Sequence, residues 1–149
     1  MTQYIRIIVL VTTAVAIGAC DESLSTLAGP SPNLAPSFAS VQQEIFETTD
    51  TAGRTACVTC HTNVGRNPSG GLNLLRDLAF AQLVGTSSTQ KPGTPRVVPG
   101  DPDASYLIQK LEGRVGITGR RMPFNGPPYL TDGQLLIIRR WIAIGAPRD

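Results

Sequence analysis

Apolar residues recur at helical spacing in several stretches of this chain, each closed by glycine or proline. The stretches run over residues 37–49, 74–84, 101–112 and 131–144. The positions that carry the pattern are Val41, Ile45 and Phe46, then Leu75, Leu78, Ala79 and Leu83, then Tyr106, Leu107, Lys110 and Leu111, and finally Leu135, Ile138, Trp141 and Ile142. The only strand-like piece is Arg96-Val97-Val98, so the pattern predicts an all-α domain.

Start signals support three of these helices, and the first is Ser37, which can cap the helix predicted over 37–49. Asp101-Pro102-Asp103 offers a capping carboxylate followed by proline at the first helical position, and Thr131-Asp132-Gly133-Gln134 is a capping box. Stretches rich in glycine and proline over residues 65–71, 86–100 and 113–129 are expected to be long irregular loops. No internal repeat is present, which favours one domain.

The N-terminal residues 1–19 have the features of a secretory signal peptide. A short segment with one basic residue, Arg6, precedes an uncharged apolar run over 7–18, which is shorter than the about 20 residues needed to span a bilayer. The run ends in Ile17-Gly18-Ala19-Cys20, which resembles the lipobox of bacterial lipoproteins, with Cys20 as the acylated residue. An uncleaved signal anchor with an incidental cysteine is the alternative.

Residues 20–37 are predicted to be a linker, because they are rich in proline and serine and have no helical or alternating period. The folded domain is therefore expected over residues 38–149, a length suited to a single core. The formal net charge of the whole chain is +2, and loss of the signal peptide would remove only Arg6 from the basic residues. A chain this close to neutral is not expected to bind nucleic acid.

Cys57-Val58-Thr59-Cys60-His61 is the most specific motif in the chain. It matches the C-x-x-C-H pattern of covalent c-type haem attachment. On a helical turn, positions i, i+3 and i+4 share one face, so two thiols can add to the two haem vinyl groups while the imidazole lies under the iron. His61 is the only histidine in the sequence and is the candidate proximal ligand.

Other interpretations of this cysteine pair stay open at this point. A structural zinc site needs four ligands, and the chain has only three cysteines and one histidine, with Cys20 assigned to lipidation. A thioredoxin-like redox pair needs βαβ units, which the sequence after Cys60 does not suggest. A plain disulfide between Cys57 and Cys60 is possible in an oxidising compartment. The haem interpretation also explains the export signal, because bacteria attach haem c outside the cytoplasmic membrane.

The order of the predicted elements and several short phrases resemble a class I cytochrome c domain of the bacterial monohaem kind, over residues 38–147. The phrases are Gly71-Leu72 with Leu74, Pro99-Gly100-Asp101-Pro102 with Ser105-Tyr106-Leu107, Arg121-Met122-Pro123, and Trp141-Ile142 with Gly145-Ala146. The resemblance implies that the first and last helices cross and pack beside one haem. The long loop over 86–100 departs from a compact domain of this class, at the surface around the haem edge.

Met122 is the candidate for the sixth iron ligand. Met1 would leave with the signal peptide, so Met122 is the only thioether that remains, and no second histidine competes with it. The resemblance places a distal methionine in a loop before the last helix, where Met122 lies. A thioether favours Fe(II), so a His/Met pair raises the reduction potential. A methionine used only to fill the core is the alternative.

The resemblance also suggests supporting groups. A metal-bound histidine usually donates its second N–H to a carbonyl or carboxylate oxygen. The family uses a proline carbonyl after the motif, which makes Pro68 the candidate. Arg120 and Arg121 flank Met122, and either one of them pairs with a haem propionate or both are solvated surface residues.

These features predict a membrane-tethered monohaem c-type cytochrome that carries single electrons between redox protein partners, with one haem c as cofactor. No catalytic residue and no small-molecule substrate are expected. The alternatives are an open-iron haem enzyme or gas sensor of the peroxidase-like kind, or a cytochrome subunit of an oxidase or dehydrogenase complex. We expect export and a lipid anchor at Cys20 that holds the chain on the periplasmic side. Asp21 resembles a signal for retention at the inner membrane.

Overall fold

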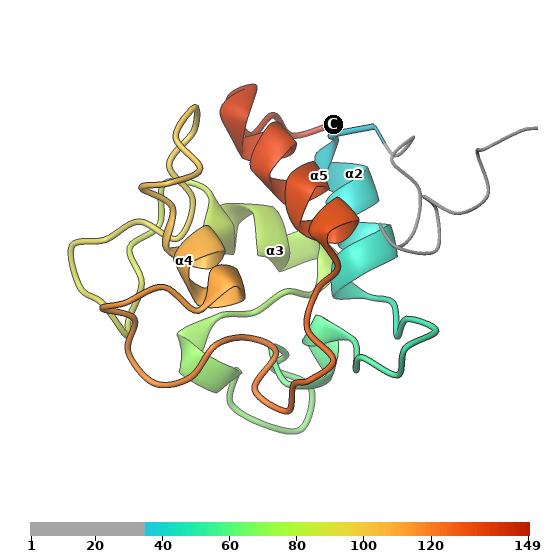
Figure 1. Cartoon of the computed structure of the whole chain (residues 1–149). Helices are drawn as coiled ribbons and strands as arrows, with labels where there is room; N and C mark the ends of the chain where they lie inside the picture. The colour runs from blue at the N-terminus through green and yellow to red at the C-terminus, as the bar shows by residue number, and fades with distance from the viewer. Residues whose placement is uncertain (1–34) are drawn as a thin grey trace, which may run out of the picture.

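The computed structural model describes residues 35–149, so the predicted signal peptide over 1–19, Cys20 and most of the 20–37 linker lie outside the described residues. The elements are α2 (Phe38–Ser40), which continues as a π-helix (Val41–Phe46), α3 (Arg76–Leu83), α4 (Tyr106–Glu112) and α5 (Asp132–Ala143), with 3-10 turns at Cys57–Thr59 and Ser69–Gly71 (Figure 1). Within this part of the chain, β-structure is limited to isolated bridges, which confirms the all-α prediction. None of its helices is long and apolar enough to cross a membrane.

Two helices begin at the predicted caps. The Ser40 amide donates to the Ser37 hydroxyl over 3.0 Å at the start of α2. At the start of α5, the Gln134 amide donates to the Thr131 hydroxyl over 3.2 Å, and the Thr131 amide donates to the Gln134 side-chain oxygen over 3.1 Å. These bonds satisfy amides that have no partner inside the helix, so local sequence alone is enough to place both starts.

Helix α4 begins later than predicted. The Asp101 carboxylate accepts the Ala104 amide over 2.9 Å in a turn before the helix, and the Asp101 carbonyl accepts the Ser105 hydroxyl over 2.7 Å. The helix itself begins after Ser105, whose backbone is extended. The predicted start signal at Asp101 therefore forms a separate turn before the helix, in which both Ala104 and the Ser105 side chain are bonded to Asp101.

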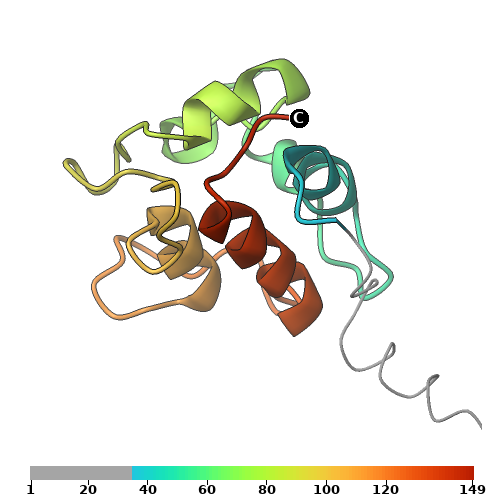
Figure 2. The ribbon, with the colours of Figure 1, turned by 90° about the horizontal axis from the view of Figure 1, so that it is seen from above.

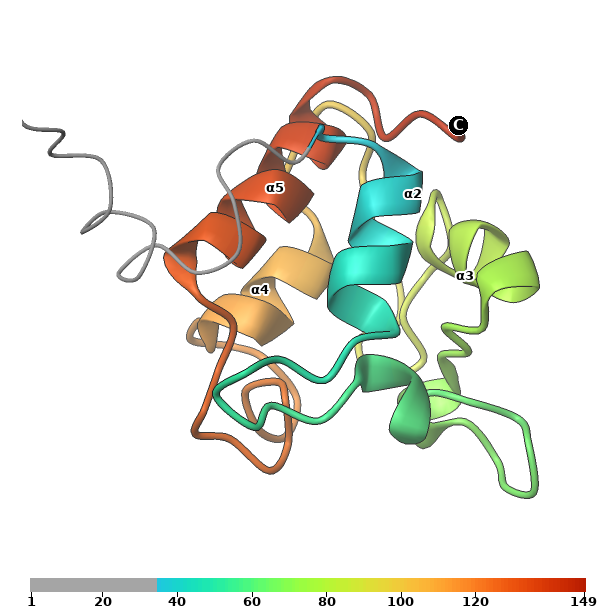
Figure 3. The ribbon, with the colours of Figure 1, turned by 90° about the vertical axis from the view of Figure 1, so that its right-hand side faces the viewer.

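The core lies where α5 packs against the first helix and α4. Figure 2 shows α5 between these two elements, and Figure 3 shows α2 and α5 side by side. Trp141 is fully buried, and its ring centre lies 5.5 Å from that of Phe38, which meets Phe80 edge-on at 5.2 Å. Buried side chains of this size contribute about 1.5–3 kcal/mol each. One predicted core position is wrong, because Leu78 is 41% exposed.

The long loop over 86–100 is tied to α3 rather than free. The Val97 amide donates to the Leu83 carbonyl over 3.1 Å, and the Gly85 amide donates to the Val97 carbonyl over 3.1 Å. Val97 is fully buried. The loop therefore belongs to the packed domain, and it brings Ser88 and Arg96 to the site described below.

Candidate functional site

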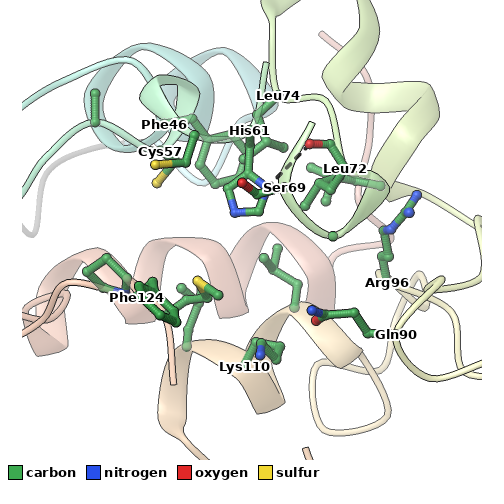
Figure 4. A pocket seen from close by; sticks show the side chains of 18 of the residues that line it. Phe46, Cys57, His61, Ser69, Leu72, Leu74, Gln90, Arg96, Lys110 and Phe124 are labelled. Atoms are coloured by element: carbon green, nitrogen blue, oxygen red, sulfur yellow. Dashed lines mark hydrogen bonds between the residues drawn. The ribbon is translucent and has the colours of Figure 1, made fainter. Parts of the chain in front are cut away.

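A cavity of about 640 Å³ opens beside the motif turn. Its size falls in the range of about 300–1,000 Å³ that small-molecule and cofactor sites occupy. Figure 4 shows Cys57 and His61 on one side, Lys110 and Phe124 on the opposite side, and Arg96 toward the long loop. The cavity is lined by all four of the residues predicted for cofactor binding in the described part of the chain, namely Cys57, Cys60, His61 and Met122.

The motif forms a single tight turn. The amides of Cys60 and His61 both donate to the Cys57 carbonyl, over 3.2 Å and 3.0 Å. This closure brings the first cysteine and the histidine onto the same turn, as the spacing predicted. Cys57 is half-buried and Cys60 is exposed, and no disulfide joins them in the structure of residues 35–149.

The His61 ring is oriented by a backbone carbonyl. Its Nδ1 lies 3.3 Å from the Leu72 carbonyl oxygen, as drawn in Figure 4. The prediction that Pro68 would provide this acceptor is wrong, because the partner of Nδ1 is Leu72, and the Pro68 carbonyl instead accepts the Gly71 amide over 3.0 Å. The chain reverses at Gly70 and Gly71, whose φ values of 60° and 61° suit glycine, and it then returns past the ring.

This orientation leaves one ring nitrogen for a metal. When Nδ1 donates to Leu72, Nε2 keeps its lone pair and faces away from that bond. Burial lowers the pKa of His61 below its usual value, although the Leu72 and Ser69 carbonyls act in the opposite direction. The neutral imidazole, which is the form that binds metal ions, is therefore favoured.

A buried guanidinium supports the other end of the motif. Arg54 is 1% exposed, its Nε donates to the Asp50 carboxylate over 3.0 Å, and its Nη1 lies 3.8 Å from Cys57 Sγ. Burial raises the pKa of Cys57, and the positive charge of Arg54 opposes that rise. The cysteine is therefore held as a thiol in an apolar setting, with Arg54 fixing the segment that precedes it.

Met122 enters the cavity from a loop that is bonded to α4. Its amide donates to the Lys110 carbonyl over 2.9 Å. Its side chain packs against the core and lines the same cavity as His61. Because Lys110 lies across the cavity from His61 (Figure 4), this bond holds the methionine segment on the far side from the histidine.

The charged groups at the cavity are all cationic. Arg66, Arg96 and Lys110 line it, and no aspartate or glutamate is among the lining residues in the described part of the chain. Arg96 is 5% exposed and donates to the carbonyls of Gln82 and Gly71 over 2.8 Å and 3.1 Å. The site therefore suits a ligand with acidic groups.

The two arginines beside Met122 are engaged elsewhere. Arg121 Nε donates to the Leu111 carbonyl over 2.7 Å, and its guanidinium lies 4.0 Å from the Tyr129 ring centre. The Arg120 guanidinium lies 5.2 Å from the ring centre of Phe124. Neither arginine lines the cavity, so the hypothesis that one of them pairs with a propionate has no geometric support.

Several residues of the site were not predicted from the sequence. Arg54, Leu72 and Arg96 come from three separate segments, and Lys110 was expected only as part of a helix pattern. Their roles depend on which backbone carbonyls and side chains fold next to them. Only the basic character of Arg96, inside a strand-like piece, offered a signal.

The site does not contain a cluster of metal-ligating side chains of the zinc type. Among residues 35–149, no group of three or more histidine, cysteine, aspartate or glutamate side chains is placed to hold a metal ion. The structure of these residues therefore gives no support to the structural zinc alternative.

No family model, curated protein or solved structure matches this chain.

Proposed function

We propose that this chain is a c-type cytochrome that carries single electrons, with one haem attached through Cys57 and Cys60 and its iron held by His61 and Met122. The observation that carries the proposal is the gathering, around one cavity, of the attachment motif and the only methionine other than Met1. Haem bound there supplies a reversible one-electron couple between Fe(III) and Fe(II).

The residues of the cavity fit this group. An imidazole nitrogen and a thioether sulfur are the iron ligands of a His/Met c-type site, and two thiols are the groups that attach the haem covalently. Apolar side chains such as Leu74, Leu83 and Leu111 provide a wall for a flat hydrophobic ring system. The buried Arg96 offers a cation for the acidic substituents of haem, which is the role first assigned to Arg120 or Arg121.

The surroundings favour a carrier over an enzyme. Peroxidase-like chemistry needs an acid–base group near an open iron position. No carboxylate and no histidine other than His61 line the described cavity, and the ammonium of Lys110, which also lines it, is held by the carbonyls of Thr118 and Arg120. The role of the chain is then to orient His61, to hold Met122 and to exclude water from the site. The protein would exchange electrons with its partners and would not transform a substrate.

The arrangement of helices is compatible with the class I cytochrome c fold that we propose. The first helix and α5 pack together, with α4 on the other side of α5 (Figure 2). The motif turn follows the first helix directly, and the methionine loop lies between α4 and α5.

The proposal is tested on the full chain produced in a bacterium with a haem attachment system. We expect haem to remain with the protein after acid–organic extraction, one reversible one-electron reduction, and a ferrous form that resists carbon monoxide. Extraction of the haem would rule out thioether attachment. Rapid carbon monoxide binding would favour an open-iron enzyme or sensor instead.

We also propose that the mature chain is tethered to a membrane, facing the periplasm, by lipid on Cys20, with redox proteins as its partners. Acyl chains and the predicted linker would let the domain meet more than one partner. The proposal rests on the lipobox-like sequence, since Cys20 lies outside the described residues.

Replacing Cys20 with alanine is expected to prevent lipid attachment to the chain. Without the thiol no acyl chain can be attached, while the haem motif is unchanged. Fractionation and mass spectrometry of the N-terminus measure the effect. A wild-type chain that is recovered in the soluble fraction with an unmodified Cys20 contradicts the tether. Wild-type protein found only in the outer membrane contradicts the retention role of Asp21.

A further inference from the structure

We propose that Lys110 is a positioning residue that clamps the methionine loop, residues 118–122, to α4 and so keeps the distal side of the site closed. This inference rests on the proposed function, in which Met122 is an iron ligand. According to this proposal, the distal side stays closed because of the Lys110 side chain as well as the iron–sulfur bond.

Lys110 holds the loop at both of its ends. Its Nζ donates to the Thr118 carbonyl over 2.8 Å and to the Arg120 carbonyl over 2.6 Å. Its own carbonyl accepts the Met122 amide over 2.9 Å. One residue therefore bonds three positions within five residues of loop. Lys110 is only 7% exposed, so water competes little for these bonds.

The backbone conformation of the loop allows two of its carbonyls to bond the Lys110 ammonium group. Gly119 lies between the two bonded carbonyls and has a φ of 74°. This left-handed backbone is free of strain only for glycine, and it turns the chain so that the carbonyls on both sides of Gly119 reach the same ammonium. A side chain added at Gly119 would also point at Lys110, because its Cβ would lie 4.0 Å from Nζ.

Other bonds from α4 act on the same segment. The Thr118 amide donates to the Tyr106 hydroxyl over 2.9 Å, and Arg121 Nε donates to the Leu111 carbonyl over 2.7 Å. Helix α4 is itself braced to α5, since Arg139 bonds the Glu112 carboxylate over 2.9 Å. The loop is thus attached mainly to α4, and one further bond, from the Thr118 hydroxyl to the Gln90 carbonyl over 2.9 Å, joins it to the loop over 86–100.

The choice of lysine at this position argues for a specific role. Burying an ammonium costs free energy, and Lys110 has no carboxylate partner among the described residues. An apolar side chain would fill the same space at lower cost. What the ammonium adds is a pair of charge-assisted bonds to the loop that carries Met122. Figure 4 shows Lys110 across the cavity from His61.

The test compares Lys110→Met with Lys91→Met in the full haem-loaded chain. The chain has only these two lysines among its basic residues, and Lys91 lies over the Tyr106 ring with no bond to the loop. We expect K110M to raise the amide hydrogen exchange rate over 118–122 by about tenfold or more, because bonds to a charged group are lost. Carbon monoxide should then bind the ferrous K110M protein, while K91M behaves like wild type.

Local and general effects are separated by where exchange changes. A clamp predicts faster exchange in 118–122 with little change in α5, whereas a merely structural lysine predicts faster exchange throughout. Uniform acceleration, or no acceleration in the loop, would overturn the inference. A wild-type protein that already binds carbon monoxide quickly would instead refute the closed iron of the proposed function.

A second variant keeps the test decisive if K110M does not fold. Tyr106→Phe removes only the acceptor of the Thr118 amide and preserves the shape of the core. We expect a smaller rise in exchange over the same five residues. An unchanged exchange rate there in Y106F would contradict attachment of the loop to α4.

Discussion

Replacing both Cys57 and Cys60 with serine is expected to abolish covalent haem attachment completely. Each thioether forms when a thiol S–H adds across a vinyl double bond, and a serine hydroxyl does not replace the thiol in this addition. His61 would remain to bind iron, so some haem can stay associated without a covalent bond. Haem staining on a denaturing gel and the mass of the intact protein measure the loss.

The matched controls for this variant lie within the chain. A Cys20 replacement removes the third cysteine without touching the motif, so haem should stay attached. Each single serine variant should keep one thioether and therefore some covalent haem. Covalent haem in the double variant would show that the motif turn does not hold the cofactor.

Replacing Met122 with alanine is expected to open the iron and lower the reduction potential. Losing a thioether removes a ligand that stabilises Fe(II), so the potential should fall by on the order of 0.1 V or more, within the roughly 0.8 V range set by axial ligands. The ferric protein should lose its sulfur-to-iron charge-transfer band, and the ferrous protein should bind carbon monoxide. Folding should survive, because both thioethers and His61 remain.

Val115 provides the control for disturbance of the same long loop. It is fully exposed, so Val115→Ala should leave the band and the potential unchanged. A Met122→Ala protein that keeps the band and still excludes carbon monoxide would show that another group fills the sixth position. The comparison with Lys110→Met is then informative, because that variant keeps the thioether and the backbone bond of the Met122 amide, and loses only the two ammonium bonds to the loop.

The two variants separate the ligand from its position. Met122→Ala changes both the potential and the access of carbon monoxide. In K110M the sulfur is still present, so the potential of molecules with a closed loop should stay near the wild-type value while access increases. Together they distinguish a site closed by the iron–sulfur bond from one closed by the loop.

The sequence by itself determined the elements whose cause is local. The capping box at Thr131 predicts the start of α5, because its bonds join residues only three apart. The motif spacing predicts the turn of Cys57–His61 for the same reason. The prediction of Met122 as a ligand followed from a count of residue types, and Met122 and His61 line the same cavity.

Only the tertiary structure decided which residues support the side chains of the site. The acceptor for His61 is Leu72 and not Pro68, because the glycine reversal at 70–71 returns the chain past the ring. The buried Arg96, one of three cations at the cavity, is carried there by a loop that pairs with the end of α3. These contacts join residues distant in the sequence, and no short pattern of hydrophobic and polar positions encodes them. The same holds for the buried Lys110. Helical spacing predicted its place on α4, but it did not predict the loop carbonyls to which its ammonium group donates.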